Sequence, residues 1–347
     1  MWRVRGRARY LRDMTVYSKR LGEITDAQFD AALRRAGLGR FVAAEAISQG
    51  LFGQNVFLTS TEGRFVFRGA PHWHDGKQDD AWQFPKERLY AERLHATGAP
   101  VAWPQVLDDA GDLFPWPYLI MPRLPGLCVA NDLKALARED WPKVARAVGE
   151  ALAGLQRLTH PVAGDFDPAA QAIAPFEDGY VAHLVRQIQT LIREGEADGA
   201  LTGADVAWIE ALIGADDGNE PPAVYVHNDF SLGNVLVERH GEGWRVSGVV
   251  DLMTSCFGDG CADFARLAGQ FIQGGGPHAA TFLAGYREAG GAARPAPARL
   301  ALVTAVERLL IWNYFRRQSP AWLEGHTFRS WAEPYVEALA AAWQAAA

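Results

Sequence analysis

The sequence has little cysteine and no long apolar segment, and these absences exclude several classes of protein. Its 347 residues contain only three cysteines, too few for a disulfide framework and without the spacing of a zinc site. No apolar run approaches the roughly 20 residues that a membrane-spanning helix needs. The net charge of −7 argues against a general nucleic-acid binder. We therefore expect a cytoplasmic protein with no membrane or nucleic-acid partner.

Hydrophobic residues make up 49% of the chain, which is enough for a substantial core. The first 20 residues are different, because they carry seven basic residues and one acidic residue. A nucleic-acid-binding arm is one interpretation, whereas a signal peptide is excluded because the segment has no apolar stretch. We expect residues 1–20 to form a disordered leader, with upstream sequence translated ahead of a true start at Met14 as one interpretation.

The strongest chemical signal is a polar loop that follows an apolar run at 223–226. The loop contains His227 and Asp229, and Asn234 follows five residues after Asp229. An aspartate in such a loop can orient a substrate hydroxyl and accept its proton.

A β-hairpin is predicted directly after this loop. Apolar runs at 235–237 and 244–250 flank a short segment rich in turn-forming residues. The two open ends of a hairpin lie side by side, so Asn234 should meet Asp251. An amide oxygen and a carboxylate suit Mg²⁺, which prefers oxygen ligands.

These residues resemble the aminoglycoside phosphotransferase family, the small-molecule relatives of protein kinases. The family's catalytic loop has the form H-x-D-x-x-x-x-N, which here runs from His227 to Asn234. The resemblance implies that Asp229 is catalytic and that His227 braces the loop. It also implies that Asn234 and Asp251 bind Mg²⁺.

The resemblance further predicts an α+β, two-lobed protein-kinase-like fold, with a small β-rich N-terminal lobe and a large, mainly helical C-terminal lobe. We expect the nucleotide-binding lobe at residues 21–121, the hinge at 122–126, and the catalytic and substrate lobe at 127–347. Asp259 and Asp263 match a Gly-Asp…Asp element of the family, and they should cap the following helix and support the site.

In the N-terminal lobe, Thr25 and Gln28 form a capping box at the start of a helix that Gly37 can end. A strand, a glycine-bearing turn and a second strand are expected over 46–58, and a third strand at 64–68. A helix should follow at about 85–97.

The resemblance assigns nucleotide contacts to this lobe. Gly50, Gly53 and Asn55 would let the backbone approach phosphates. Arg68 stands where the family usually has a lysine, and its guanidinium can bridge two phosphate oxygens. Its expected partner is Glu87, with Glu92 as the alternative.

The segment 116–126 reads as a strand that runs into a turn. In the resembled fold it is the hinge that binds adenine. Met121 would lie behind the base, Pro122 would offer its carbonyl and Leu124 its N–H.

The rest of the chain is predicted to be mainly helical, with helices near 140–158, 176–194 and 203–213, and from 264 onward. The segment 141–222 has thirteen acidic and five basic residues. These acids form a solvated surface or line a cleft for a cationic substrate.

The expected activity is transfer of the ATP γ-phosphate, with Mg²⁺, to a hydroxyl of a small molecule. The resemblance favours a cationic aminoglycoside or aminocyclitol antibiotic, and Arg68 with the 115–121 run is similar to hygromycin phosphotransferases.

The alternative is a metabolic kinase for choline, homoserine or a sugar-like alcohol. A nucleotide-binding pseudokinase is disfavoured because Asp229, Asn234 and Asp251 are all present. A protein kinase is disfavoured because Ser231 stands where those enzymes usually have a lysine.

Overall fold

The computed structural model describes residues 14–18, 21–47, 55–70, 83–130, 136–273 and 278–346. The chain divides into two compact units. The first takes its described residues from Met1–His95 and Val101–Leu124, and the second from Ala96–Pro100 and Pro125–Ala347. None of the helices in the described ranges is both long and apolar enough to cross a membrane.

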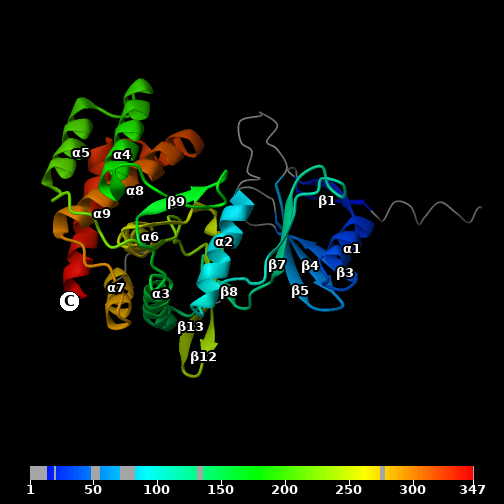
Figure 1. Cartoon of the computed structure of the whole chain (residues 1–347). Coiled ribbons are helices and arrows are strands. Elements are labelled where there is room, and N and C mark those ends of the chain that lie inside the picture. The colour runs from blue at the N-terminus through cyan, green and yellow to red at the C-terminus, as the bar shows by residue number, and fades with distance from the viewer. Residues whose placement is uncertain are drawn as a thin grey trace, which may run out of the picture. The chain divides into compact units, whose positions relative to one another are not determined.

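The first unit is built on an antiparallel sheet with the strand order β3-β4-β5-β7-β6 (Figure 1). Its strands are β3 (Phe41–Ala46), β4 (Asn55–Ser60), β5 (Arg64–Gly69), β7 (Tyr118–Pro122) and β6 (Val106–Asp108). The second and third strands of the predicted hairpin are confirmed. The predicted first strand lies too far toward the C-terminus, because β3 ends at Ala46 and does not begin there. The predicted glycine-bearing turn lies outside the described residues.

The two faces of this sheet pack against different helices, α1 (Asp26–Arg35) and α2 (Gln83–Ala96). Side chains of a strand alternate between faces, so β7 contributes Ile120 to one core cluster and Met121 to the other. Phe29 of α1 belongs to the first cluster and Phe84 of α2 to the second. Both helices were predicted, and the capping box of Thr25 at the start of α1 is confirmed.

The predicted disordered leader is wrong in its last part. Residues Met14–Ser18 form β1, which pairs antiparallel with β2 (Gly22–Thr25). The segment MTVYS is rich in β-branched and aromatic residues, which favour strands, and the ring of Tyr17 meets Phe29 edge to face at 5.4 Å. The arginines that precede it dominate the composition of the first 20 residues and hide this signal. Residues 1–13 lie outside the described part of the chain.

The second unit is mainly helical, with two small sheets. Its helices include α3 (Trp141–Leu155), α4 (Gly179–Ala197), α5 (Gly203–Ala215), α6 (Ala262–Gln273), α7 (His278–Glu288), α8 (Pro297–Gln318) and α9 (Phe328–Ala345). One sheet has the order β10-β9-β14-β11, from Ala172–Pro175, Gly164–Asp167, Cys256–Gly258 and Val224–Val226. The other has the order β13-β12-β8, from Gly243–Val249, Val235–His240 and Leu127–Cys128. The predicted helices and the predicted hairpin are therefore present, with helix ends shifted by a few residues.

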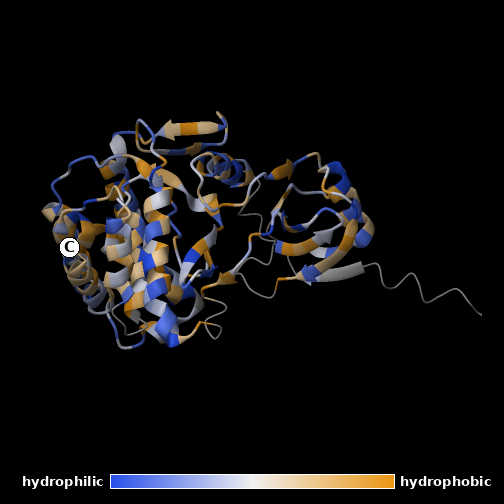
Figure 2. Ribbon diagram, turned by 90° about the horizontal axis from the view of Figure 1, so that it is seen from below, coloured by the Kyte–Doolittle hydropathy of each residue, from blue (hydrophilic) through white to orange (hydrophobic). Residues whose placement is uncertain are grey.

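Helix packing in this unit is tight because the helices are amphipathic and carry small residues where they cross. Hydrophobic and hydrophilic residues alternate along the helical ribbons in Figure 2. On α3, the side chains of Val144, Val148 and Leu152 are fully buried. A Cβ at Gly149 of α3 would overlap the backbone of α7, and one at Gly285 of α7 would overlap the backbone of α3. The two backbones are therefore in direct contact.

Candidate functional site

The polar loop that follows β11 is fixed by a fully buried histidine. The Nε2 atom of His227 lies 3.0 Å from the carbonyl oxygen of Val250, and the backbone N–H of Asp229 donates to Nδ1 at 3.3 Å. Because Nδ1 accepts, Nε2 must carry the proton and donate to Val250. His227 thus ties the loop to the end of β13, which fits the bracing role expected of it.

The second anchor of the loop is Asp263, in the first turn of α6. Its two carboxylate oxygens accept the backbone N–H groups of His227 and Asn228, each at 2.9 Å. Burial raises the pKa of Asp263 to about 6. The sequence predicted that Asp263 caps its own helix and supports the site. Its carboxylate holds the loop that carries Asp229, which agrees with the second part and not with the first.

Asp229 and Asn234 are joined within the loop. The Nδ2 group of Asn234 donates to the backbone oxygen of Asp229 at 2.9 Å and to its Oδ2 at 3.0 Å. The backbone N–H of Val250 donates to the carbonyl of Asn234 at 3.0 Å, which places Asp251 beside this residue across the hairpin. Asp251 itself has a left-handed backbone, with a φ of 68°.

Asn234 and Asp251 offer oxygen donors of the kind that Mg²⁺ prefers. The nitrogen of the Asn234 amide is committed to Asp229, so only its oxygen can serve as a cation ligand. Among the described residues, no three histidine, cysteine, aspartate or glutamate side chains gather as metal ligands. Mg²⁺ is commonly held by only one or two carboxylates together with substrate phosphates and water, so this donor set is adequate.

An arginine that the sequence did not single out lies beside Asp229. The Nη1 atom of Arg266, on α6, lies 2.6 Å from Oδ1 of Asp229, and its Nε lies 2.9 Å from Oε1 of Glu307 on α8. Arg266 interrupts an apolar stretch of α6, and the adjacent Glu307 and Arg308 interrupt an apolar stretch of α8. Charged residues within apolar runs were the signal that could have identified them.

In the first unit, Arg68 of β5 and Glu87 of α2 form the expected ion pair. The Nη1 atom of Arg68 lies 2.9 Å from Oε2 of Glu87, and both residues are buried. Glu92, the alternative partner, is exposed. Asn55 lies directly opposite Arg68 in the β4–β5 register, and its buried Oδ1 has no hydrogen-bond partner within the described ranges. Gly50 and Gly53 lie outside those ranges.

The predicted adenine-binding segment lies at the end of β7. Met121 is buried in the core cluster on the α2 face of the sheet, and Leu124 packs partly buried against the same cluster. Pro122 is the last residue of β7 and lies opposite Phe65. These neighbours give an apolar environment of the kind that a purine ring requires.

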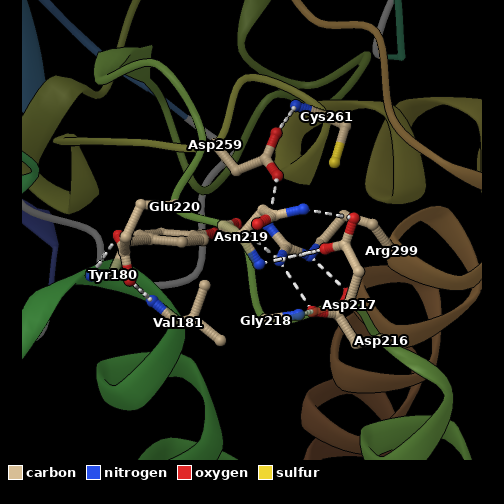
Figure 3. Close-up of polar contacts among 10 residues, drawn as sticks. All are labelled: Tyr180, Val181, Asp216, Asp217, Gly218, Asn219, Glu220, Asp259, Cys261 and Arg299. Carbon is tan, nitrogen blue, oxygen red and sulfur yellow. Dashed lines mark hydrogen bonds and ion pairs between the residues drawn. The ribbon is translucent and has the colours of Figure 1, made fainter.

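Two acidic residues of 141–222, Asp216 and Glu220, hold other parts of the fold in place (Figure 3). Asp216 binds Arg299 of α8 through two hydrogen bonds of 2.6 and 2.7 Å, and Asp259 accepts from the same guanidinium at 3.1 Å. Glu220 accepts the backbone N–H groups of Tyr180 and the next residue, at the start of α4. Asp259 also accepts the backbone N–H of Cys261 ahead of α6, so it supports that helix as expected.

Comparisons with known proteins agree with this geometry. Residues 43–303 match the model of the phosphotransferase enzyme family. A homoserine kinase of Neisseria meningitidis serogroup B is 24% identical over 255 residues, which cover 73% of this chain and 72% of that protein.

Among solved structures, aminoglycoside 2'-phosphotransferase-IIIa with GDP has a TM-score of 0.56 at 12% identity, over 89% of this chain and 96% of that one. An aminoglycoside-3'-phosphotransferase of type VIII has a TM-score of 0.53 at 19% identity, over 81% and 99%. A related enzyme with GDP and kanamycin has a TM-score of 0.55 at 12% identity, over 89% and 96%. The predicted protein-kinase-like fold is confirmed.

Proposed function

Because this chain belongs to the phosphotransferase enzyme family, we propose that it transfers the γ-phosphate of ATP to a hydroxyl group of a small molecule. The observation that supports this proposal best is that the Asp229 carboxylate is held in place and is also partly exposed. Its carboxylate is held by Asn234 and Arg266, yet 30% of the side chain is exposed and can meet an acceptor. A fixed but accessible carboxylate is what a group that orients a hydroxyl requires.

In the proposed reaction, Asp229 orients the acceptor hydroxyl and takes its proton. The hydroxyl oxygen forms a bond to the γ-phosphorus, the bond to the β-phosphate oxygen breaks, and ADP leaves. Asn234 and Asp251 would hold Mg²⁺, which neutralises phosphate charge when it is bound. Arg68 would bind the phosphates.

The remaining nucleotide contacts are assigned to the first unit. Glu87 fixes the guanidinium of Arg68, and Asn55 lies beside it on β4. Met121, Pro122 and Leu124 would form the adenine site, with hydrogen bonds from the Pro122 carbonyl and the Leu124 N–H. Use of ATP is consistent with a cytoplasmic enzyme.

Two classes of acceptor are candidates. A cationic aminoglycoside or aminocyclitol is supported by the likeness to phosphotransferases of such antibiotics, and the chain would then be a resistance enzyme. A metabolic alcohol is supported by the homoserine kinase relative and by the cationic Arg266 beside Asp229.

ADP release measured with a panel of acceptors tests the proposed activity. Kanamycin and hygromycin represent the first class, and choline, homoserine and glucose represent the second. We expect ADP release that depends on at least one acceptor, together with a phosphorylated product. Tight ATP binding without acceptor-dependent ADP release would contradict the proposal.

The variant Asp251→Asn tests the magnesium site. It removes one negative charge from the expected ligand set, so the Mg²⁺ concentration at half-maximal ATP binding should rise about tenfold or more. The matched variant Asp217→Asn changes an exposed aspartate and should leave the midpoint unchanged. An unchanged midpoint for Asp251→Asn would remove Asp251 from the site.

A further inference from the structure

The position of Arg266 restricts which acceptors can reach Asp229. Its Nη1 atom lies 2.6 Å from Oδ1 of Asp229, the residue that the proposed function assigns to the acceptor hydroxyl. A hydroxyl bound to Asp229 would therefore lie within about 6 Å of a full positive charge, because a hydrogen bond adds roughly 2.7 Å. The side chain of Arg266 is 28% exposed, so an acceptor can touch it.

Arg266 shares its counter-ion Glu307 with a second arginine. Glu307 is buried and serves both Arg266, at 2.9 Å, and the neighbouring Arg308, at 3.9 Å. The Arg308 guanidinium also lies over the rings of Trp331 and Tyr335. Burial raises the pKa of Glu307, so its carboxyl group ionises less readily. Arg266 and Arg308 thus share one buried glutamate, and Arg266 also lies near the carboxyl groups of Asp229 and Asp263.

About half of the acids of 141–222 already have partners. Five pair with arginines: Asp178 with Arg186, Glu194 with Arg317, Asp198 with Arg316, and both Asp216 and Asp217 with Arg299. Glu220 holds the start of α4, and Asp205 the start of α5. These seven of the thirteen acids are therefore less available to a cationic acceptor than the sequence alone suggests.

We propose that Arg266 determines specificity by binding an anionic group, such as a carboxylate, that the acceptor carries close to its reacting hydroxyl. This inference rests on the proposed function of Asp229. A guanidinium has five N–H donors and can bind a carboxylate through two of them while another remains on Asp229. The acceptor is then a small hydroxy acid.

Paired acceptors in which a neutral amide replaces a carboxylate provide the test. Glycerate and glyceramide, and gluconate and gluconamide, are compared by kcat/KM, with kanamycin as the polycation. We expect at least one acid to exceed its neutral partner about tenfold or more, as charge-assisted hydrogen bonds are stronger than neutral ones. Kanamycin should be poorer than that acid.

The variant Arg266→Gln separates specificity from general activity. It also loosens Asp229, so kcat should fall for both members of a pair, but the acid-to-neutral ratio of kcat/KM should collapse to about one. Arg266→Lys should keep part of the ratio, and Arg146→Gln, which breaks an exposed ion pair with Glu288, should keep all of it. Calorimetric binding of each pair with a non-hydrolysable ATP analogue gives the same comparison without turnover.

Two results would overturn the inference while leaving the proposed activity intact. One is turnover of kanamycin or neutral alcohols that exceeds that of every acid. The other is an acid-to-neutral ratio, in turnover or in binding, that Arg266→Gln does not change. A chain that phosphorylates no acceptor at all would instead contradict the proposed function.

Discussion

Two arginine–glutamate pairs, one in each unit, have the same chemistry and different surroundings. Arg68 and Glu87 are sealed, with 7% and 2% of their side chains exposed. In the second pair Glu307 is also buried, with 9% of its side chain exposed, but Arg266 is 28% exposed and has a second carboxylate, Asp229, which is 30% exposed. The guanidinium of Arg68 therefore has little contact with water, whereas that of Arg266 is partly open to it.

Because the two arginine–glutamate pairs differ in exposure, they should respond differently to mutation. Removing one partner of a buried pair takes a counter-ion from a buried charge, which is costly. Removing one partner of an open pair leaves a guanidinium that keeps Asp229 and some contact with water. The following variants test this contrast.

The largest loss of stability is expected for Glu87→Ala. The buried guanidinium of Arg68 would lose the carboxylate at 2.9 Å, so the free energy of unfolding should fall by about 3–5 kcal/mol. Urea unfolding measures this change. The control Glu333→Gln weakens an exposed ion pair within α9 and should change stability by about 0.5 kcal/mol or less. Equal effects of the two variants would show that the Arg68 pair is not sealed.

A pH-dependent effect of intermediate size is expected for Asp263→Asn. Burial raises the pKa of Asp263 to about 6, so the carboxyl holds its proton more tightly in the folded chain than in the unfolded chain. Its contribution to stability is present below about pH 4 and is lost as the pH rises to about 6. An asparagine does not titrate. The wild type should therefore lose about 2–3 kcal/mol relative to the variant over this range. Urea unfolding at several pH values should show the change, and a constant difference would contradict it.

A smaller effect is expected for Glu307→Gln. Arg266 keeps its contact with Asp229, and the amide oxygen can still accept a hydrogen bond, so the loss should be about 1–2 kcal/mol. Thermal and urea unfolding give the value. A loss as large as that of Glu87→Ala would mean that the second pair is as closed as the first.

The sequence predicts those parts of the site that depend on local patterns. The β12–β13 hairpin follows from two apolar runs around a turn, and its register brings Asp251 beside Asn234. The Arg68–Glu87 pair was implied by the resemblance of this strand end and the next helix to the aminoglycoside phosphotransferase family. Neither inference requires knowledge of how helices cross.

Arg266 and Glu307 could not be placed in this way, because they meet only through the rotation and crossing of α6 and α8. They are 41 residues apart, and no periodicity links them. The same limit explains why Asp263 was assigned to its own helix and not to the backbone of the loop after β11.

Turnover of the variant Asp229→Ala tests the central claim most directly, because Asp229 is expected to act on the acceptor and not on the nucleotide. With an acceptor that the wild type phosphorylates, kcat should fall about 10²–10⁴-fold, as is typical for loss of a general base. The affinity for Mg²⁺-ATP should stay within about twofold of the wild-type value, because the proposed role of Asp229 is on the acceptor side of the reaction. Glu210→Ala, which changes an exposed acid on α5, should leave both quantities unchanged. Retention of more than about a tenth of the wild-type kcat by Asp229→Ala would contradict the assignment of Asp229 as the group that orients and deprotonates the acceptor.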